Sequence, residues 1–333
     1  IPSAVGGSPD GRGVGAAASY EARKFGVRSA LPSARAIQLC PHLKFVRPRF
    51  ELYSEVSAQV FEVFAEATEL VEGLSIDEAF LDVTINKLGL ASATEVAKRV
   101  RERICEVTSG LTASAGVASN KFVAKLASDF RKPNGLTVVR PENVQAFLDP
   151  LAVGRIWGVG PVTEKRFQAL GLTTIGQVRT SEVGLLETEF GEDHAAHFRA
   201  LARGEDDRPV VTHWDPKSFG SETTFEKDLL DLALLKAVID DQAEEVTEQL
   251  LRGDYFARTV TLKLRYSDFT TITRSRTSPT KPPFRDAAAV AACARDLLAS
   301  ATDAGERPVR LIGVSVTNLI GPEQPIQWWL DLP

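Results

Sequence analysis

The spacing of hydrophobic residues changes repeatedly along the chain, and each change predicts a different element. Apolar positions at helical spacing over 50–67 predict an amphipathic helix. The other elements predicted before residue 140 are a helical region over 19–40, strands over 72–83, 111–117 and 136–139, and helices over 94–108 and from Ser119. Strands and helices that alternate in this way predict an α+β arrangement on one sheet.

The second half of the chain continues the alternation. Residues 141–204 are helical and interrupted by glycines, and the charged stretch 205–217 has no hydrophobic period, which predicts a linker. The elements predicted after it have a βαββαβ order: a strand over 218–225, a helix over 229–251, strands over 258–266 and 270–278, a helix over 286–301 and a strand over 309–319. Thr259, Thr261, Lys263 and Arg265 alternate with apolar residues, so this sheet is predicted to have one buried face and one polar, basic face.

Composition excludes several classes of protein. Hydrophobic residues make up 44% of the 333 residues and charged residues 25%, as in globular proteins, and no apolar run approaches the roughly 20 residues of a membrane span. Cys40, Cys105 and Cys293 are far apart, so neither a disulfide framework nor a zinc site is indicated. A reducing, cytoplasmic location is expected.

The net charge of -5 is unfavourable for binding nucleic acid, but the charges are segregated. The predicted helix within 228–248 is acidic, whereas the strands after it are rich in lysine and arginine. Segregation of this kind is expected where one face meets a polyanion, although ordinary solvated faces have the same pattern.

Asp77 and Glu78 are the most informative candidate site residues. They are adjacent carboxylates among apolar residues, where desolvation is costly unless a cation compensates for it. Oxygen ligands favour Mg²⁺, which one or two carboxylates usually hold together with substrate phosphates. Adjacent strand residues point to opposite faces, so both can serve one site only where a strand begins, bends or bulges. An exposed, charged strand end is the alternative.

Four ordered segments carry a family resemblance. They are AASYEARKFGVRSALPSARA at 17–36, LSIDEAFLDV at 74–83, SAGVASNKFVAKLASDFRKPNGLTVV at 114–139 and IWGVGPVTEKRFQALGLTTIGQV at 156–178. The chain resembles the Y-family DNA polymerases, in particular the bacterial DNA polymerase IV (DinB) branch. The resemblance implies a multidomain α+β protein with a ferredoxin-like palm, helical fingers and thumb, and a βαββαβ little finger. The implied boundaries are fingers 1–48, palm 49–139, thumb 140–206, linker 207–217, little finger 218–320 and tail 321–333.

The resemblance also implies an activity, a template-directed DNA polymerase of low fidelity that extends primers past damaged bases with dNTPs. Asp77 would bind two Mg²⁺ ions, for which Mn²⁺ can substitute, and Glu78 would bind the ion that activates the primer 3′-hydroxyl. Tyr20, Arg23 and Lys132 match residues that contact the incoming triphosphate. Many relatives have a hydroxyl residue where this chain has Ala17, so one triphosphate contact is expected to be missing.

Further segments resemble the family's DNA and clamp contacts. Gly158, Val159 and Gly160 resemble the turn of a helix-hairpin-helix, where glycines let the backbone approach a phosphate. The little-finger cations expected along the template-primer duplex are Arg258, Lys263, Arg265, Arg274 and Arg276.

The C-terminal tail contains Gln327, Leu330 and Leu332 in a Q-x-x-L-x-L pattern that resembles a sliding-clamp motif. The alternative is that Trp328 and Trp329 fold back onto the domain. A monomer in the bacterial cytoplasm, associated with the nucleoid, is expected.

One part of the family pattern has no counterpart here. Relatives open with a strand that bears a further metal-binding aspartate, followed by an aromatic residue that excludes ribonucleotides. The chain contains no methionine and starts at Ile1, so roughly the first thirty residues of a typical member are expected to be absent. The palm sheet would then lack a central strand and activity would be impaired. Restoring the segment is expected to restore Mg²⁺-dependent extension.

Two other functions are compatible with parts of the pattern. A nucleotide cyclase also has a ferredoxin-like sheet with two metals, but it needs no helix-hairpin-helix and no GGDEF-like run is present. A non-catalytic accessory relative would bind DNA and clamp without chemistry, and retention of the carboxylates and triphosphate residues argues against it. Replacing Asp77 with Ala separates these readings.

Overall fold

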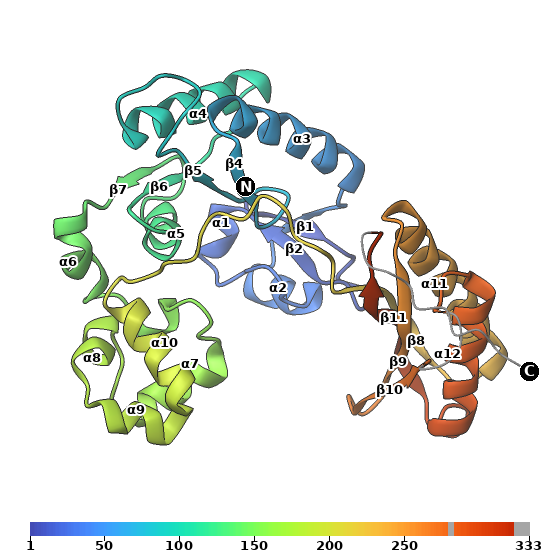
Figure 1. The fold of residues 1–333 in the computed structure, drawn as a ribbon. Helices are drawn as coiled ribbons and strands as arrows, with labels where there is room; N and C mark the ends of the chain where they lie inside the picture. Colours follow the sequence, from blue (N-terminus) through green and yellow to red (C-terminus); the bar gives the residue numbers. More distant parts are fainter. Residues whose placement is uncertain (279–282, 323–333) are drawn as a thin grey trace, which may run out of the picture. The chain divides into compact units, whose positions relative to one another are not determined.

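The computed structural model describes residues 1–278 and 283–322, which form two compact units. One unit contains residues 49–214, and the other combines 1–48 with 215–333 (Figure 1). Among the residues described, none of the helices has both the length and the apolar character needed to cross a membrane.

The first part of the 49–214 unit is the α+β region. Its elements are α3 Phe50–Ala67, β4 Leu70–Gly73, β5 Ala79–Asp82, α4 Ala93–Val107, β6 Ala115–Val117, α5 Lys121–Phe130 and β7 Leu136–Val138. The inner stripe of α3 packs on α4 through Val63, Phe64 and Val100, so the predicted apolar face of 50–67 is the buried one.

The strands of this region form two separate two-stranded sheets. β4 pairs antiparallel with β5, and β6 pairs parallel with β7. The prediction of one continuous sheet is therefore wrong for the described residues.

Helix α5 packs directly against β6 because of a glycine. A Cβ at Gly116 would overlap the carbonyl group of Ala124 and the amide of Ser128, both in α5. The N-terminus of α5 is capped by Asn120, whose side chain accepts a hydrogen bond from Val123 N at 3.0 Å. The glycine thus lets the helix lie directly on the strand, and the cap defines where the helix begins.

Residues 141–204 are helical, as predicted. The helices are α6 Val144–Leu148, α7 Pro161–Ala169, α8 Ile175–Thr180, α9 Val183–Phe190 and α10 Glu192–Ala202. Phe167, Phe190 and Phe198 form an aromatic cluster at their centre, with ring centroids 4.5–5.4 Å apart. Residues 205–214 follow α10 and contain no helix or strand.

The first 48 residues of the other unit form a small sheet with short helices. Their elements are β1 Ser3–Gly6, β2 Gly15–Ala18, α1 Tyr20–Arg23, α2 Ser33–Leu39 and β3 Lys44–Val46, with strand order β2-β1-β3. The predicted helical region over 19–40 is divided into α1 and α2, and Gly26, which lies between them, has a φ of 85°. β2 and β3 were not predicted, because strands this short have too few positions to show a period of two.

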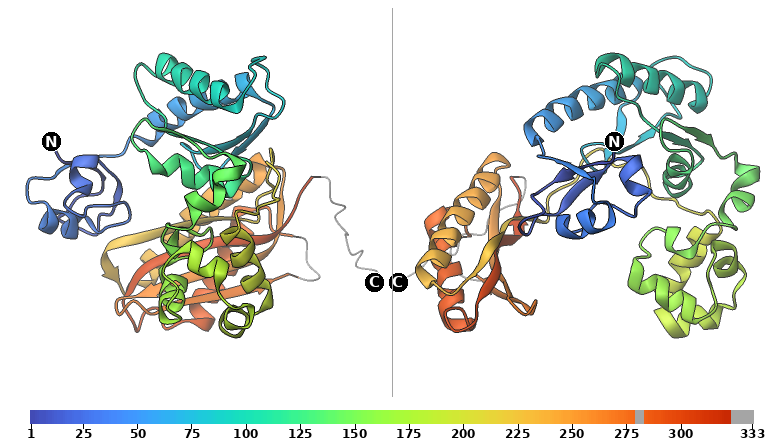
Figure 2. Two further views of the ribbon diagram at one scale, coloured as in Figure 1. Left: turned by 90° about the vertical axis from the view of Figure 1, so that its left-hand side faces the viewer. Right: turned by 180° about the vertical axis from the view of Figure 1, so that it is seen from behind.

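Residues 218–320 form the predicted βαββαβ domain. The elements are β8 Ser218–Leu229, α11 Leu232–Arg252, β9 Phe256–Tyr266, β10 Thr271–Thr277, α12 Ala287–Ala301 and β11 Val309–Ile320. The antiparallel sheet has the order β10-β9-β11-β8. Both helices cover one face, where Ile239 and Leu297 pack against Val260 and Leu262 (Figure 2). The other face carries no helix of this domain.

Candidate active site

Asp77 and Glu78 lie at the end of the turn that joins β4 to β5. Leu74 N and Ser75 N both donate to the Glu78 carbonyl, at 2.8 and 3.3 Å, which closes the turn just before β5 begins at Ala79. The prediction of one strand over 72–83 is therefore wrong, since residues 74–78 form this turn. The condition that a strand begins, bends or bulges at these two carboxylates is met by the start of β5 directly after Glu78.

The two carboxylates differ in their surroundings. Asp77 is exposed, and its Oδ1 accepts a hydrogen bond of 2.6 Å from the Ser75 hydroxyl. Glu78 is partly buried, and its Oε1 is 2.7 Å from Lys125 Nζ of α5. The expected desolvation of the pair is thus absent at Asp77, because the turn projects beyond the packed part of the hairpin.

This donor set fits Mg²⁺ only in part. Two carboxylates on one turn offer hard oxygen ligands, and Mg²⁺ commonly takes one or two of these and completes its shell with water and phosphate. Among the described residues, no group of three or more His, Cys, Asp and Glu side chains could hold a metal ion. The chain's own contribution to a metal site is therefore the Asp77–Glu78 pair.

Two lysines of helix α5, Lys121 and Lys125, and Lys132 after it bind carboxylates of the same unit. Lys121 Nζ lies 2.6 Å from Glu72 Oε2 of β4, and both side chains are buried. Lys132, just beyond the helix, lies 2.8 Å from Asp129 Oδ1. Burial raises the pKa of the Asp129 carboxyl, but Lys132 and the neighbouring cations lower it more, so the group stays ionised beside the residue predicted to contact triphosphate.

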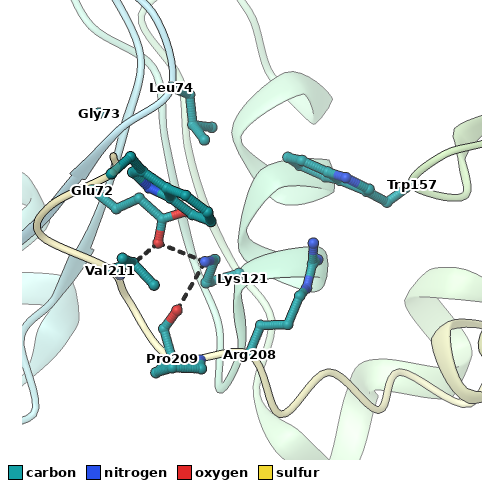
Figure 3. A pocket seen from close by; sticks show the side chains of 9 residues that line it. Glu72, Gly73, Leu74, Lys121, Trp157, Arg208, Pro209 and Val211 are labelled. Atoms are coloured by element: carbon teal, nitrogen blue, oxygen red, sulfur yellow. Dashed lines mark hydrogen bonds and ion pairs between the residues drawn. The ribbon is translucent and has the colours of Figure 1, made fainter. Parts of the chain in front are cut away.

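A cavity of about 480 Å³ opens between the β4 end, α5 and residues 208–214 (Figure 3). Trp157, Trp214 and Arg208 line it, with the Arg208 guanidinium 5.1 Å from the Trp157 ring centre. Lys121 Nζ donates to Pro209 O at 2.9 Å, and Val211 N donates to Glu72 Oε2 at 2.7 Å. Asp77 and Glu78 are not among its lining residues, so this cavity is a packing feature of the linker and not the predicted metal site.

Sequence reasoning missed the contacts of Glu72, Lys121 and Lys125. The signal for the two lysines was their spacing of four residues on one mainly apolar helix. Their carboxylate partners come from distant segments, and only the fold identifies them.

Tyr20 and Arg23 lie on α1, in the unit that contains 1–48. Both are exposed, and the Arg23 guanidinium lies 5.2 Å from the Tyr20 ring centre while its Nε donates to Ala18 O at 3.1 Å. Ser19 caps this single turn of helix, accepting a hydrogen bond from Ala22 N at 3.3 Å. Tyr20 and Arg23, two of the three side chains predicted to contact triphosphate, therefore share one short helix that Ser19 caps.

The predicted helix-hairpin-helix turn precedes α7. Gly158 has a φ of 89°, which favours glycine, and Gly160 is the N-terminal capping residue of α7. A Cβ at either glycine would meet nothing within 4 Å, so the backbone here is open to a ligand.

The five predicted little-finger cations are divided between the two faces of the sheet. Arg265 and Lys263 pair with Thr271 and Thr273 on the face without helices. Arg274 and Arg276 pair with Leu262 and Val260, so they lie on the helix-covered face.

The two arginines on the covered face are bound by α12. Arg274 Nε donates to Ala301 O at 2.7 Å, and Arg276 Nη2 lies 2.5 Å from Asp296 Oδ2. Arg258 is exposed between buried Ala257 and Thr259. A single strand face that gathers all five cations is therefore excluded.

The open face is rich in hydroxyl groups. Thr261 bonds Ser275 at 2.8 Å and Thr259 bonds Thr277 at 2.9 Å across the strands, while Lys263 is 2.7 Å from Glu222. The predicted polar face is confirmed, but it is less basic than expected. Gln327, Leu330 and Leu332 lie outside the described residues.

Comparison with known proteins gives a consistent assignment. Residues 1–129 match the model of the impB/mucB/samB family, 141–172 match the IMS family HHH motif, and 216–328 match the impB/mucB/samB family C-terminal domain. DNA polymerase IV of Alkalilimnicola ehrlichii is 47% identical over 96% of this chain and 88% of that protein. DNA polymerase IV of Exiguobacterium sibiricum is 44% identical over 100% of this chain and 91% of that protein.

Solved structures agree with these relatives. A Y-family DNA polymerase chimera of Dbh and Dpo4 has a TM-score of 0.82 and 28% identity, covering 96% of this chain and 92% of that one. An insertion ternary complex of Dbh DNA polymerase has a TM-score of 0.66 at the same identity and coverage. The chain belongs to the Y-family DNA polymerases, in the branch of the bacterial DNA polymerase IV proteins.

Proposed function

We propose that this translesion DNA polymerase extends primers on damaged templates with a metal site built on Asp77 and Glu78. The activity of a DNA-directed DNA polymerase follows from the family. The observation that carries the site is the β4–β5 turn, which presents two neighbouring carboxylates at the start of a strand, one of them exposed. If Asp77 and Glu78 lay within an extended strand, their side chains would point to opposite faces of the sheet.

Mg²⁺ is the metal proposed, with Mn²⁺ as a substitute. Asp77 and Glu78 would hold it, and the bound ions would supply charge stabilisation for the attacking and leaving oxygens of an in-line transfer. The protein's own task is positioning: Ser75 orients Asp77, and Lys125 meets Glu78.

Tyr20, Arg23 and Lys132 are proposed to bind the triphosphate of the incoming dNTP. A hydroxyl, a planar guanidinium fork and a compact ammonium group suit a polyanion. Arg23 and Tyr20 are exposed on one helical turn. Ala17 provides no hydroxyl, so the triphosphate is held by fewer contacts than in relatives that have one.

Primer-template DNA is proposed to contact two surfaces that do not read sequence. One is the open backbone at Gly158 and Gly160 before α7, where amide groups favour a phosphate. The other is the open face of the β10-β9-β11-β8 sheet, where threonine and serine hydroxyls lie beside Lys263 and Arg265. Hydroxyl and cationic donors to phosphate position a duplex without specifying its bases.

The remaining proposals concern the protein in its cell. We place it in the bacterial cytoplasm at the nucleoid, as a monomer that reaches the sliding clamp through Gln327, Leu330 and Leu332. The curated relatives are bacterial, and the pattern of the tail supplies hydrophobic anchors for a groove on a partner. A purely accessory role is not favoured, since the chain retains the carboxylates and the triphosphate residues.

Primer extension on templates with and without an N2-guanine adduct tests the function. It is measured with the unsubstituted chain and with the Asp77→Ala variant. We expect Mg²⁺-dependent extension past the adduct by the unsubstituted chain. Asp77→Ala should abolish extension and leave DNA affinity unchanged. Extension that survives Asp77→Ala, or no extension by the unsubstituted chain, would reject the site.

A further inference from the structure

Helix α5 binds the β4–β5 hairpin through two lysines that are one helical turn apart. Lys121 Nζ lies 2.6 Å from Glu72 Oε2, before the turn, and Lys125 Nζ lies 2.7 Å from Glu78 Oε1, after it. Residues i and i+4 share one helix face, so both ammonium groups reach the same hairpin. The turn that bears Asp77 is thereby attached to α5 on both sides.

The two ion pairs differ in burial. The Lys121 and Glu72 side chains are 9% and 5% exposed, whereas those of Lys125 and Glu78 are 24% and 39% exposed. The first pair is almost enclosed and lies away from Asp77, so we assign it to holding the fold. The second pair stands at the surface that carries Asp77, where a bound cation and substrate phosphates can reach the carboxylate.

The base of the Lys125 side chain is well fixed. α5 contributes buried Phe122, Val123 and Leu126 to the core, and Gly116 lets it lie directly on β6. Asp206 also accepts a hydrogen bond from Phe122 N at 2.9 Å. A lysine that projects from so rigid a helix can restrict the glutamate that it meets.

We infer that Lys125 is a positioning residue for Glu78: it holds the carboxylate in the place from which Glu78 binds a divalent cation. This inference rests on the proposed function. A carboxylate has about four acceptor sites, so one bond from Lys125 leaves others for a cation. Groups that hydrogen-bond a metal-binding carboxylate typically change metal affinity or activity about 10–100-fold when removed.

The test measures Mn²⁺ binding directly, by electron paramagnetic resonance, with primer-template DNA whose primer ends in a dideoxynucleotide. Lys125→Met, Lys125→Arg, Glu78→Gln and the double variant Glu78→Gln/Lys125→Met are compared with the unsubstituted chain. Lys121→Met serves as the contrast, since its lysine binds the same hairpin away from the site. Thermal unfolding of each variant is recorded in parallel.

We expect Lys125→Met to weaken Mn²⁺ binding about 10–100-fold with an unchanged unfolding midpoint. Lys125→Arg should retain most of the affinity because it keeps charge and reach. In the Glu78→Gln background, Lys125→Met should cause no further loss of Mn²⁺ affinity. Lys121→Met should lower the unfolding midpoint, and if it does not fold, the comparison of Lys125→Met with Lys125→Arg still decides.

Two results would overturn the inference alone. They are unchanged Mn²⁺ affinity in Lys125→Met while Glu78→Gln weakens binding, and an equal loss from Lys125→Met with or without Glu78. Mn²⁺ binding that Glu78→Gln does not weaken would instead remove the proposed metal site, and the inference with it.

Discussion

The buried pair of Lys121 and Glu72 shows how one residue can hold several segments together. Glu72 Oε2 accepts from both Lys121 Nζ and Val211 N, and Lys121 Nζ also donates to Pro209 O. Strand β4, helix α5 and the linker therefore meet at two side chains. A charge so enclosed is tolerated only while its partner remains.

Lys121→Met should lower the free energy of unfolding by about 3–5 kcal/mol, because it leaves the Glu72 carboxylate buried and unpaired. Lys98→Met, at an exposed position of α4, is the matched control and should change it by less than about 0.5 kcal/mol. Urea denaturation of the two variants measures the difference. Equal effects would show that the pair is dispensable.

Asp206 has a similar role in anchoring the linker, and its effect depends on pH. Burial raises the pKa of the Asp206 carboxyl, but the hydrogen bonds and charge of Arg208 and the amide of Phe122 lower it more, so its net pKa lies below the ordinary value. A carboxyl with a lowered pKa in the folded state stabilises the fold above its unfolded pKa, about 3.9, and loses this as pH falls through the folded pKa.

Asp206→Asn should therefore reduce stability at pH 7 by about 1.5–3 kcal/mol, the range for a hydrogen bond to a charged group. The difference from the unsubstituted chain should stay constant down to about pH 5 and shrink below about pH 4. Urea denaturation across that pH range measures it. A difference that grows on acidification would have the wrong sign for this account.

At the scale of elements, strand β10 decides what its arginines do. Antiparallel register puts Arg274 and Arg276 opposite apolar residues of β9, on the side covered by α12, and places Thr271, Thr273 and Ser275 on the open side. Charge alone did not distinguish these positions, since all five little-finger cations lie within strand-like segments. The face on which a side chain lies depends on which residue of the neighbouring strand it meets.

Alanine at Lys263 or Arg265 should weaken DNA binding and reduce the slope of log affinity against log salt by about one each. Alanine at Arg276 should leave this slope unchanged and instead destabilise the packing of α12, because it removes the ion pair with Asp296. DNA titrations at several salt concentrations, with thermal unfolding in parallel, separate the two classes. A reduced slope for Arg276→Ala would contradict the assignment of faces.

At the scale of the whole molecule, residues 1–48 group with 215–333 and not with the segment that follows them. Within that unit, Arg12 reaches β8: its Nη1 is 2.6 Å from Asp228 Oδ1 and 2.8 Å from Phe225 O. Residues more than two hundred positions apart in the chain are involved. No local pattern could have indicated this contact.

Clamp binding is proposed for the C-terminal tail. Removing residues 323–333 should abolish stimulation of extension by the clamp and leave extension without the clamp unchanged, because the motif lies beyond the catalytic and DNA-binding residues. Extension is measured on primed circular DNA with and without loaded clamp. Stimulation that persists after removal would place the clamp contact elsewhere.

The sequence by itself determined the order of helices and strands over 218–320, the helix over 50–67, the helical region over 141–204 and the family. These follow from periodic burial and from ordered motifs, both of which are written locally in the chain. It also identified Asp77 and Glu78 as adjacent candidate ligands, but it placed them inside one strand over 72–83 and not in the turn before β5.

Only the tertiary structure decided which charges meet. The partners of Lys121 and Lys125, the division of Arg274 and Arg276 from Lys263 and Arg265, and the separation of β4–β5 from β6–β7 all depend on strand pairing and helix packing between distant segments. A local pattern predicts which face of a helix or strand is apolar. Which residue a side chain on that face contacts depends on strand register and on packing between distant segments.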